Sequence, residues 1–334
     1  MQKGEHAPRR VVATGADAIN SVRRVRDLVR HAVSRLDQSG VGFGHCTANA
    51  FDEAVWLVSW TLHLPVEHYA DLADAAVAWP EARAALELTE LRCASRKPLA
   101  YLIGEAWLMG FRFRCDERAL VPRSLIAEAL RQETLASFMP ALSLHGDADA
   151  GDEARPLRIL DLCTGGGSLA VIAASMFEDA AVVASDISPA ALELAALNLA
   201  DYKLEQRVKL VNGDLFGGLG RQRFDLILCN PPYVNQQSMD QLPPEYRAEP
   251  RAALAGGDDG MDLVARIVAA APDHLRPGGL LVLEIGHEAR HFERRFPRLE
   301  FAYVPSAEGE NRMVAVTAAA LKAASGAAAA PSTR

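Results

Sequence analysis

Apolar residues in the first third of the chain recur at three- and four-residue spacing, the period of an amphipathic helix. The series that starts at Ile19, Val22, Val25 and Leu28 continues to Leu36. The pattern predicts helices over 19–36, Thr47–His63, Leu72–Ala78 and Pro80–Cys93. We therefore expect a helical domain over 17–96, preceded by a disordered tail over 1–16.

The pattern changes after Lys97. Short apolar pieces from Pro98 to Val121, such as Tyr101–Gly104 and Trp107–Phe113, alternate with glycine and charged residues, which predicts a β-hairpin. Ser124 then predicts the cap of a helix that runs to about Phe138. Leu144–Pro156 has no periodicity and is expected to be a surface loop. Residues 97–156 thus form a hairpin, a connecting helix and a loop.

Beyond 156, short apolar runs alternate with helical pattern, which is typical of an α/β fold with a doubly wound parallel sheet. The predicted strands are Arg158–Leu162, Ala181–Ser185, Val208–Val211, Phe224–Cys229 and Leu280–Ile285, with a late hairpin of Phe301–Val304 and Met313–Thr317. This α/β domain is expected over 157–320, and the alanine-rich tail 321–334 is expected to be disordered.

Composition narrows the class of protein. Hydrophobic residues make up 50% of the 334 and charged residues 23%, as in ordinary globular proteins. Five cysteines without a CxxC pair indicate neither a disulfide framework nor a metal site, and favour a reducing cytoplasm. No apolar signal or membrane-spanning segment is evident in the sequence. A net charge of −8 opposes independent DNA binding; it suits a basic protein partner or simply solubility.

A glycine-rich turn follows the first predicted strand of the sheet. Asp161-Leu162-Cys163-Thr164-Gly165-Gly166-Gly167-Ser168 opens a helical run, and glycines there let a ligand approach the backbone closely. Asp186 ends the next strand, where a carboxylate can accept hydrogen bonds from ribose hydroxyls. The turn alone would also suit a structural role, but together the two features indicate a nucleoside-type cofactor.

The details of the turn favour S-adenosylmethionine over other nucleosides. No Lys-Ser or Lys-Thr follows the glycines, which excludes a Walker phosphate loop, and the GxGxxG of dinucleotide enzymes is missing. Asp161 at the loop entrance suits a ligand with cationic groups. Asp214, after the third strand, is a candidate acceptor for the adenine amino group, or a helix cap. The predicted cofactor-binding set is Asp161, Cys163, Thr164, Gly165, Gly167, Asp186, Ile187, Asp214, Leu215 and Asn230.

The chemistry is expected where the fourth strand ends, at Asn230-Pro231-Pro232-Tyr233. Two prolines fix the backbone and remove two donors, so the carbonyls of this loop are free to accept hydrogen bonds. An amide-type nitrogen is a poor nucleophile because its lone pair is delocalised. If the Asn230 side chain and the Pro231 carbonyl each accept one N–H, that lone pair is aimed at the methyl carbon. Tyr233 is expected to cover the planar group by stacking.

With these motifs the sequence resembles the class I, Rossmann-like methyltransferases that modify glutamine side-chain amides in translation proteins. Within that family it looks most like the PrmB type, whose substrate is large-subunit ribosomal protein L-three; the sister PrmC or HemK type modifies peptide release factors. The residues that carry the resemblance are Cys163 within Asp161–Gly165, Pro122-Arg123-Ser124, Ala48–Pro65 and Pro243-Pro244-Glu245-Tyr246-Arg247-Ala248-Glu249-Pro250. Gly166 and Leu125 depart from the family pattern.

The resemblance implies a seven-stranded sheet, S-adenosylmethionine as cofactor, and a glutamine of this basic ribosomal protein, free or in an assembling ribosomal particle, as the methyl acceptor. It also implies that 17–96 is a substrate-recognition domain and 157–320 the methyltransferase catalytic domain. Three alternatives stay open at this point: a release-factor glutamine methyltransferase, a DNA adenine methyltransferase and a non-catalytic ribosome-assembly factor. A fourth, an NAD-dependent oxidoreductase, fails on the missing GxGxxG and on Asp161 at the loop entrance. A DNA adenine methyltransferase must flip a base out of the duplex and contact phosphates, and the acidic balance of this chain opposes both. The intact Asn230 loop opposes a non-catalytic role.

Overall fold

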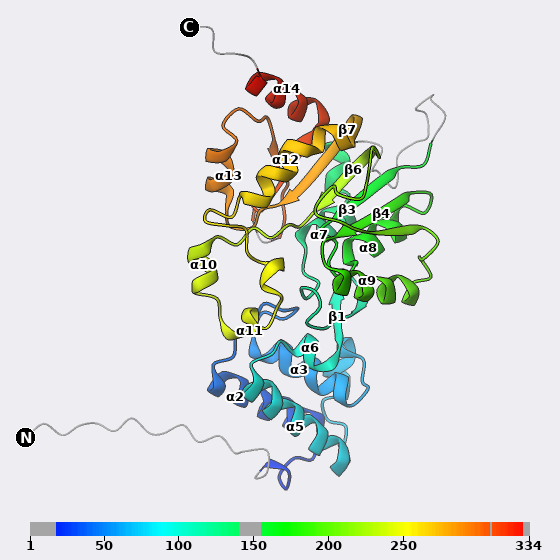
Figure 1. The fold of residues 1–334 in the computed structure, drawn as a ribbon. Helices are drawn as coiled ribbons and strands as arrows, with labels where there is room; N and C mark the ends of the chain where they lie inside the picture. Colours follow the sequence, from blue (N-terminus) through cyan, green and yellow to red (C-terminus); the bar gives the residue numbers. More distant parts are fainter. Residues whose placement is uncertain (1–17, 140–154, 308, 330–334) are drawn as a thin grey trace, which may run out of the picture. The chain divides into compact units, whose positions relative to one another are not determined.

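The fold is seen in a computed structural model, which describes residues 18–139, 155–307 and 309–329 (Figure 1). The chain divides into two compact units. The helical unit comprises Met1–Ile103 and Pro243–Ala248, and the sheet unit comprises Gly104–Leu242 and Glu249–Arg334. The predicted tail 1–16, and the predicted loop Leu144–Pro156 up to residue 154, lie outside the described residues.

Three helices build the helical unit: α2 (Val25–Ser39), α3 (Ala50–Thr61) and α5 (Trp79–Ser95). The predicted series of apolar residues forms their packed face, with Leu28, Ala32 and Leu36 almost fully buried. Helix α3 begins where the Asn49 side chain accepts from the Asp52 backbone N–H. Shorter elements complete the unit: η1 (Val66–His68), α4 (Tyr69–Leu72), α6 (Leu99–Ile103) and, from the later segment, α11 (Pro244–Arg247).

Several expected bounds were wrong, among them those of the strand expected over Leu280–Ile285, which covers Leu275–Glu284. The predicted helix Leu72–Ala78 is not helical after Leu72, because the carbonyls of Ala73 and Ala75 accept hydrogen bonds from the backbone at the start of α2. Tyr101–Ile103 is helical, not a strand, because the Pro98 carbonyl starts a helical turn by accepting from the backbone N–H groups of Tyr101 and Leu102. The helix capped by Ser124, α7, ends at Arg131 (Leu125–Arg131), since Glu133 adopts a positive φ of 54°; a separate 3₁₀ turn, η2 (Thr134–Ser137), follows.

The sheet unit is built on a seven-stranded sheet in the order β5-β4-β3-β6-β7-β9-β8. The strands are β3 (Arg158–Leu162), β4 (Ala181–Asp186), β5 (Val208–Asn212), β6 (Phe224–Cys229), β7 (Leu275–Glu284), β8 (Ala302–Tyr303) and β9 (Met313–Thr317). Strands β3 to β7 are parallel, and β9 is antiparallel to both neighbours. The predicted α/β class is confirmed. A separate hairpin, β1 (Glu105–Leu108) and β2 (Phe111–Arg114), begins the unit.

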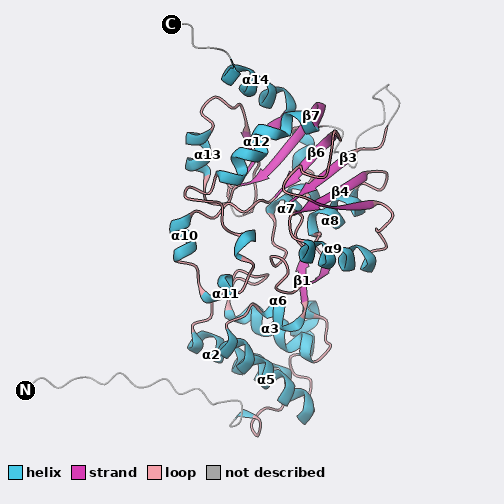
Figure 2. Ribbon diagram, in the orientation of Figure 1, coloured by secondary structure: helices cyan, strands magenta, loops and turns pink. Residues whose placement is uncertain are grey.

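Helices cover both faces of this sheet, so the unit has three layers (Figure 2). Alternate residues of the strands point to opposite faces. Leu226 and Leu228 of β6, for example, pack in one core with α7, α8 (Ser168–Met176) and α9 (Pro189–Asp201), while Ile227 packs in a second core with α12 (Asp262–His274) and α13 (Ala289–Arg295). The remaining helix between β6 and β7 is α10 (Gln236–Asp240), and η4 (Arg251–Ala253) is a short 3₁₀ turn.

The end of the chain differs from expectation. Residues Ala318–Ala329 form helix α14, so the predicted disorder of 321–334 was wrong up to 329, and 330–334 lie outside the described residues. Alanine has the highest helix propensity, and Ala318 and Leu321 are 2% and 1% exposed in the second core. Among the described helices, none is long and apolar enough to cross a membrane.

Candidate functional site

The candidate site lies where the direction of strand progression reverses. From β3 the chain moves outward through β4 to β5, and β6 and β7 lie on the other side of β3. In open α/β sheets, ligands bind outside the carboxyl ends of the strands at such a reversal. A cavity of about 370 Å³ opens here, within the size range of cofactor sites. Residues that line it lie within the segments 118–124, 161–169, 185–191, 213–215, 230–232, 250–253 and 263–266, although not every residue of these segments reaches the cavity.

Asp161, at the end of β3, is the most unusual group in the cavity wall. Its carboxylate Oδ2 accepts from Thr164 Oγ1 at 2.5 Å and from the Ala170 backbone N–H at 2.9 Å. Its Oδ1 atom is buried and has no hydrogen-bond partner in the described part of the chain. Burial, aided by the negative charge of Asp186, raises the pKa of Asp161 to about 7 despite the two donors. A buried acceptor left open in a cavity wall fits a cationic donor from a ligand.

The glycine-rich turn is held in shape from two sides. Cys163 and Gly165 adopt positive φ values of 61° and 54°. The Asp186 carboxylate accepts from the backbone N–H of Gly165 and of Ser188, each at 2.9 Å. On the other side Asn198 of α9, which is 1% exposed, donates to the Gly166 carbonyl at 2.8 Å. Asp186 therefore shapes the loop and also lines the cavity.

The segments that follow β4 and β5 supply a further part of the wall. Ile187 and Leu215 both line the cavity, and Ile187 is 64% exposed, an apolar surface that a flat ring would cover. Asp214 is paired with Arg266 at 2.6 Å, and about half of each side chain is exposed. The carboxylate predicted to accept from adenine thus already has a cationic neighbour.

The tetrapeptide Asn230–Tyr233 leaves the fully buried strand β6 at the same edge. Asn230 and Pro232 line the cavity. The Tyr233 hydroxyl donates to Glu284 Oε1 at 3.3 Å. A Cβ added at Gly286 would lie 2.4 Å from the Tyr233 ring, so that ring lies directly over a glycine.

Glu284, at the end of β7, joins Tyr233 to the start of α7. Its second oxygen accepts from Ser124 Oγ at 2.7 Å and from the Leu125 backbone N–H at 3.0 Å. Burial raises the pKa of Glu284, although these donors oppose the shift. Sequence reasoning did not single this residue out, yet a carboxylate that ends a strand of consecutive apolar residues was a usable signal.

The structure brings most predicted site residues together. Those that line the cavity are Asp161, Cys163, Thr164, Gly165, Asp186, Ile187, Asp214, Leu215, Asn230 and Pro232. Gly167, Pro231 and Tyr233 are not among the described lining residues. Gly167 instead caps α8 with a φ of 82°, where a Cβ would lie 3.0 Å from that of Ala195. Sequence reasoning missed the wall segments 118–121 and 250–253, which come from loops without periodicity.

This fold and site define a doubly wound α/β protein with a nucleoside-type cavity beside an Asn-Pro-Pro-Tyr loop, the arrangement of a class I methyltransferase. The family model described as Methyltransferase small domain matches residues 151–243. Proteins named ribosomal protein uL3 glutamine methyltransferase are similar over nearly their whole length. The one from Bordetella pertussis is 49% identical over 89% of this chain and 95% of its own. Those from Burkholderia pseudomallei and Bradyrhizobium diazoefficiens are 45% and 42% identical, over 91% and 88% of this chain and 97% and 91% of theirs.

The chain therefore belongs to the ribosomal protein uL3 glutamine methyltransferase family, as the resemblance in its motifs predicted. Membership also implies the use of S-adenosylmethionine. The described residues fit that cofactor: the open Oδ1 of Asp161 suits its ammonium group, and the exposed apolar wall at Ile187 suits its adenine.

Proposed function

We propose that this chain transfers a methyl group from S-adenosylmethionine to the side-chain amide nitrogen of a glutamine in ribosomal protein uL3. The observation that carries the proposal is the position of Asn230 and Pro232 in the wall of the same cavity as Asp161 and the glycine-rich turn. An amide acceptor bound at Asn230 then lies next to the cofactor.

The proposal gives each of these residues a role. The bound cofactor supplies an electrophilic methyl group on a sulfonium. Asp161 holds the ammonium group, and the backbone of the turn, fixed by Asp186, follows the nucleoside. The Asn230 side-chain oxygen and the Pro231 carbonyl each accept one hydrogen bond from the glutamine NH2 group, which orients its nitrogen. The nitrogen gains the methyl group in place of one hydrogen, which leaves as a proton to water. Most of the rate enhancement comes from this alignment, since positioning contributes roughly 7–11 kcal/mol and a single hydrogen bond about 1.

Methyl transfer from labelled cofactor to purified uL3, followed by mass spectrometry of the modified peptide, tests the proposal. A peptide release factor and duplex DNA at about 150 mM salt serve as comparison acceptors. Label on a glutamine of uL3 is the expected result. Label only on a release factor, or on adenine, would assign the chain to one of the other classes.

Asn230→Ala separates the chemistry from cofactor binding. We expect single-turnover methylation of uL3 to fall at least about a hundredfold, because one of two acceptors for the amide is lost from the aligned geometry. Cofactor affinity, measured by calorimetry, should stay close to that of the wild type. Asn230→Asp keeps an acceptor and should retain more activity than alanine. A wild-type rate in Asn230→Ala would remove the tetrapeptide from the mechanism.

A further inference from the structure

Glu284 lies beside the acceptor loop, although the roles proposed for Asn230 and the cofactor-binding residues make no use of it. Strands β6 and β7 are parallel neighbours, and Cys229 is paired with Leu283 (Figure 1). Glu284 is therefore level with Asn230, the first residue of the tetrapeptide, on the neighbouring strand. It is 4% exposed. A buried carboxylate is costly unless its oxygens accept hydrogen bonds, so its partners indicate what it does.

Each oxygen of Glu284 has its own partners. Oε2 accepts from Ser124 Oγ at 2.7 Å and from the Leu125 backbone N–H at 3.0 Å. These two donors stand at the start of α7, where the Ser124 hydroxyl oxygen also accepts from the Ile126 backbone N–H at 3.2 Å. Oε1 accepts from the Tyr233 hydroxyl at 3.3 Å. The carboxylate is thus fixed through one oxygen by the start of a helix, and its other oxygen bonds the acceptor loop.

The start of α7 is itself held in the wall of the cavity, which both Arg123 and Ser124 line. Arg123 donates from its two terminal nitrogens to Glu249, at 2.5 and 2.7 Å. Glu249 is 4% exposed and also accepts from the Val121 backbone N–H at 3.0 Å. A guanidinium and a carboxylate bonded in this bidentate way have a defined geometry. Glu284 therefore takes its position from a well-anchored part of the wall.

The Tyr233 ring is fixed at two points. A Cβ added at Gly286 would lie 2.4 Å from the ring, so the ring lies directly over that glycine. The hydroxyl at the far end of the ring is bonded to Glu284. A tyrosine side chain has only two rotatable χ angles, so a contact on the ring and a bond at its end together define one orientation. A ring in one orientation presents the same face to every acceptor.

We propose that Glu284 is a positioning residue, which holds the Tyr233 ring at the angle needed to cover the planar amide of the acceptor. The inference rests on the proposed function, because this angle matters for turnover only if a glutamine amide binds at Asn230. A ring that rotates would let the amide tilt, and the alignment of its nitrogen supplies most of the rate enhancement. The bond from Tyr233 to a fixed carboxylate removes that freedom before the substrate binds.

A double-mutant cycle between Glu284 and Tyr233 tests the proposal. In Glu284→Gln the two donors at the start of α7 need the remaining oxygen, so the NH₂ group faces Tyr233 and cannot accept its hydroxyl proton. Tyr233→Phe removes the same bond from the other side and keeps the ring. The matched control is Glu128→Gln within α7. Glu128 is 7% exposed, accepts from the Ala307 backbone N–H at 3.0 Å and is not among the described lining residues of the cavity.

We expect kcat for uL3 to fall at least about tenfold in Glu284→Gln and in Tyr233→Phe, with the cofactor Kd within about twofold of the wild type. The double variant should be no slower than the slower single variant, because both changes break one bond. Glu128→Gln should keep the wild-type kcat. Losses that multiply in the double variant, or a wild-type kcat in either single variant, overturn the proposal. Tyr233→Phe removes one hydroxyl from a half-buried side chain, so it tests the bond even where Glu284→Gln fails to fold.

Fluorine NMR follows the ring without any need for activity. The chain has six tyrosines, so labelling with 3-fluorotyrosine gives few signals, and that of Tyr233 is the one missing from Tyr233→Phe. We expect this signal to move in Glu284→Gln and to stay in place in Glu128→Gln. An unmoved Tyr233 signal in Glu284→Gln overturns the proposal. If the wild-type chain fails to methylate uL3, the proposed function fails, and the spectrum still decides whether Glu284 holds the ring.

Discussion

At the scale of single residues, Asp161 links cofactor binding to protonation. Its raised pKa of about 7 means that the cofactor-free protein carries a neutral carboxyl group there below that pH. A cationic ammonium favours only the ionised form, so binding must release the proton. We expect the affinity for S-adenosylmethionine to fall as the pH falls below about 7, approaching about tenfold per pH unit. Calorimetry from about pH 5.5 to 7.5 measures this directly.

The same experiment has two internal controls. Asp161→Asn cannot ionise, so its affinity should be weak and independent of pH. Methylthioadenosine lacks the ammonium and sulfonium groups, so its binding to the wild type should also be independent of pH. A flat profile for S-adenosylmethionine with the wild-type protein would show that the ammonium is bound elsewhere.

Sequence reasoning could assign Asp161 and Asp186 to the site because each lies at the carboxyl end of a buried strand, where the parallel topology fixes its position. It could not show that Asp186 shapes the loop by accepting from Gly165, or that Tyr233 donates to Glu284. These bonds join residues of different elements, and their geometry depends on packing that no local pattern encodes. The stacking role of Tyr233 remains a prediction.

At the scale of elements, the position of the Tyr233 ring can be tested by comparing alanine substitutions at two glycines, Gly286 and Gly278. An alanine at position 286 would have to adopt an unfavourable φ of +52°, and its Cβ would lie 2.4 Å from the Tyr233 ring. Gly278 has a similar φ of +76° but open space around it. We expect Gly286→Ala to lower kcat for uL3 at least about tenfold by displacing the ring, with little change in cofactor Kd. Gly278→Ala carries the same backbone strain and should keep the wild-type kcat. Equal kcat values in the two variants would show that the position of Tyr233 does not matter for turnover.

Helix α14 gives a second test at this scale. Leu321 is 1% exposed in the core shared by α12, α13 and the sheet. Leu321→Ala should therefore lower the free energy of unfolding by about 2–5 kcal/mol, as for other core leucines. Lys322→Ala, one residue on and exposed, should change it by less than about 0.5 kcal/mol. Denaturant unfolding measures the free energy for both variants. Similar small changes in the two would mean that helix α14 does not pack against the rest of the sheet unit.

Elements with a strong local signal were predictable. Strands β3, β6 and β9 have the predicted bounds, because each is a short, largely buried apolar run. The non-helical segment after Leu72 and the helix α14 were missed for opposite reasons. Backbone pairing with the start of α2 overrides helical periodicity in the first, and two buried contacts fix an alanine-rich sequence in the second.

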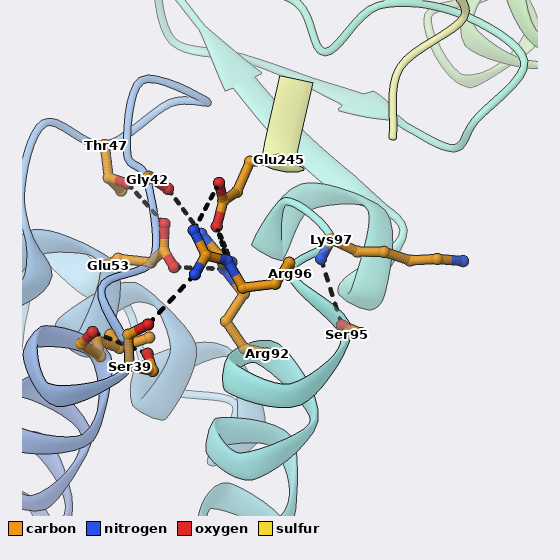
Figure 3. A network of polar contacts seen from close by, with 10 residues as sticks. Ser39, Gly42, Thr47, Glu53, Arg92, Ser95, Arg96, Lys97 and Glu245 are labelled. Atoms are coloured by element: carbon orange, nitrogen blue, oxygen red, sulfur yellow. Dashed lines mark hydrogen bonds and ion pairs between the residues drawn. The ribbon is translucent and has the colours of Figure 1, made fainter. Parts of the chain in front are cut away.

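At the scale of the whole molecule, the division into a helical part and a sheet part follows from the change in periodicity near Lys97, but the membership of Pro243–Ala248 in the helical unit could not be predicted. The key bond of this segment joins Arg96 to Glu245, 149 residues away (Figure 3). A sequence pattern shows that Pro243–Pro250 is distinctive and gives no partner for it. The partner became visible only once α5 and the Gly42 turn were placed around a buried carboxylate.

The charge of the whole chain leads to a last prediction, which rests on the proposed function. A protein with a net charge of −8 and a basic ribosomal protein attract one another over distances at which salt screens strongly, with a Debye length of about 10 Å at 0.1 M. Raising KCl from about 50 to 300 mM should therefore increase KM for uL3 about three- to tenfold and leave kcat unchanged. The cofactor Kd should move far less, because Asp161 lies within a cavity that bulk ions screen poorly. A KM that does not respond to salt would mean that apolar contacts, not charge, govern recognition of the protein substrate.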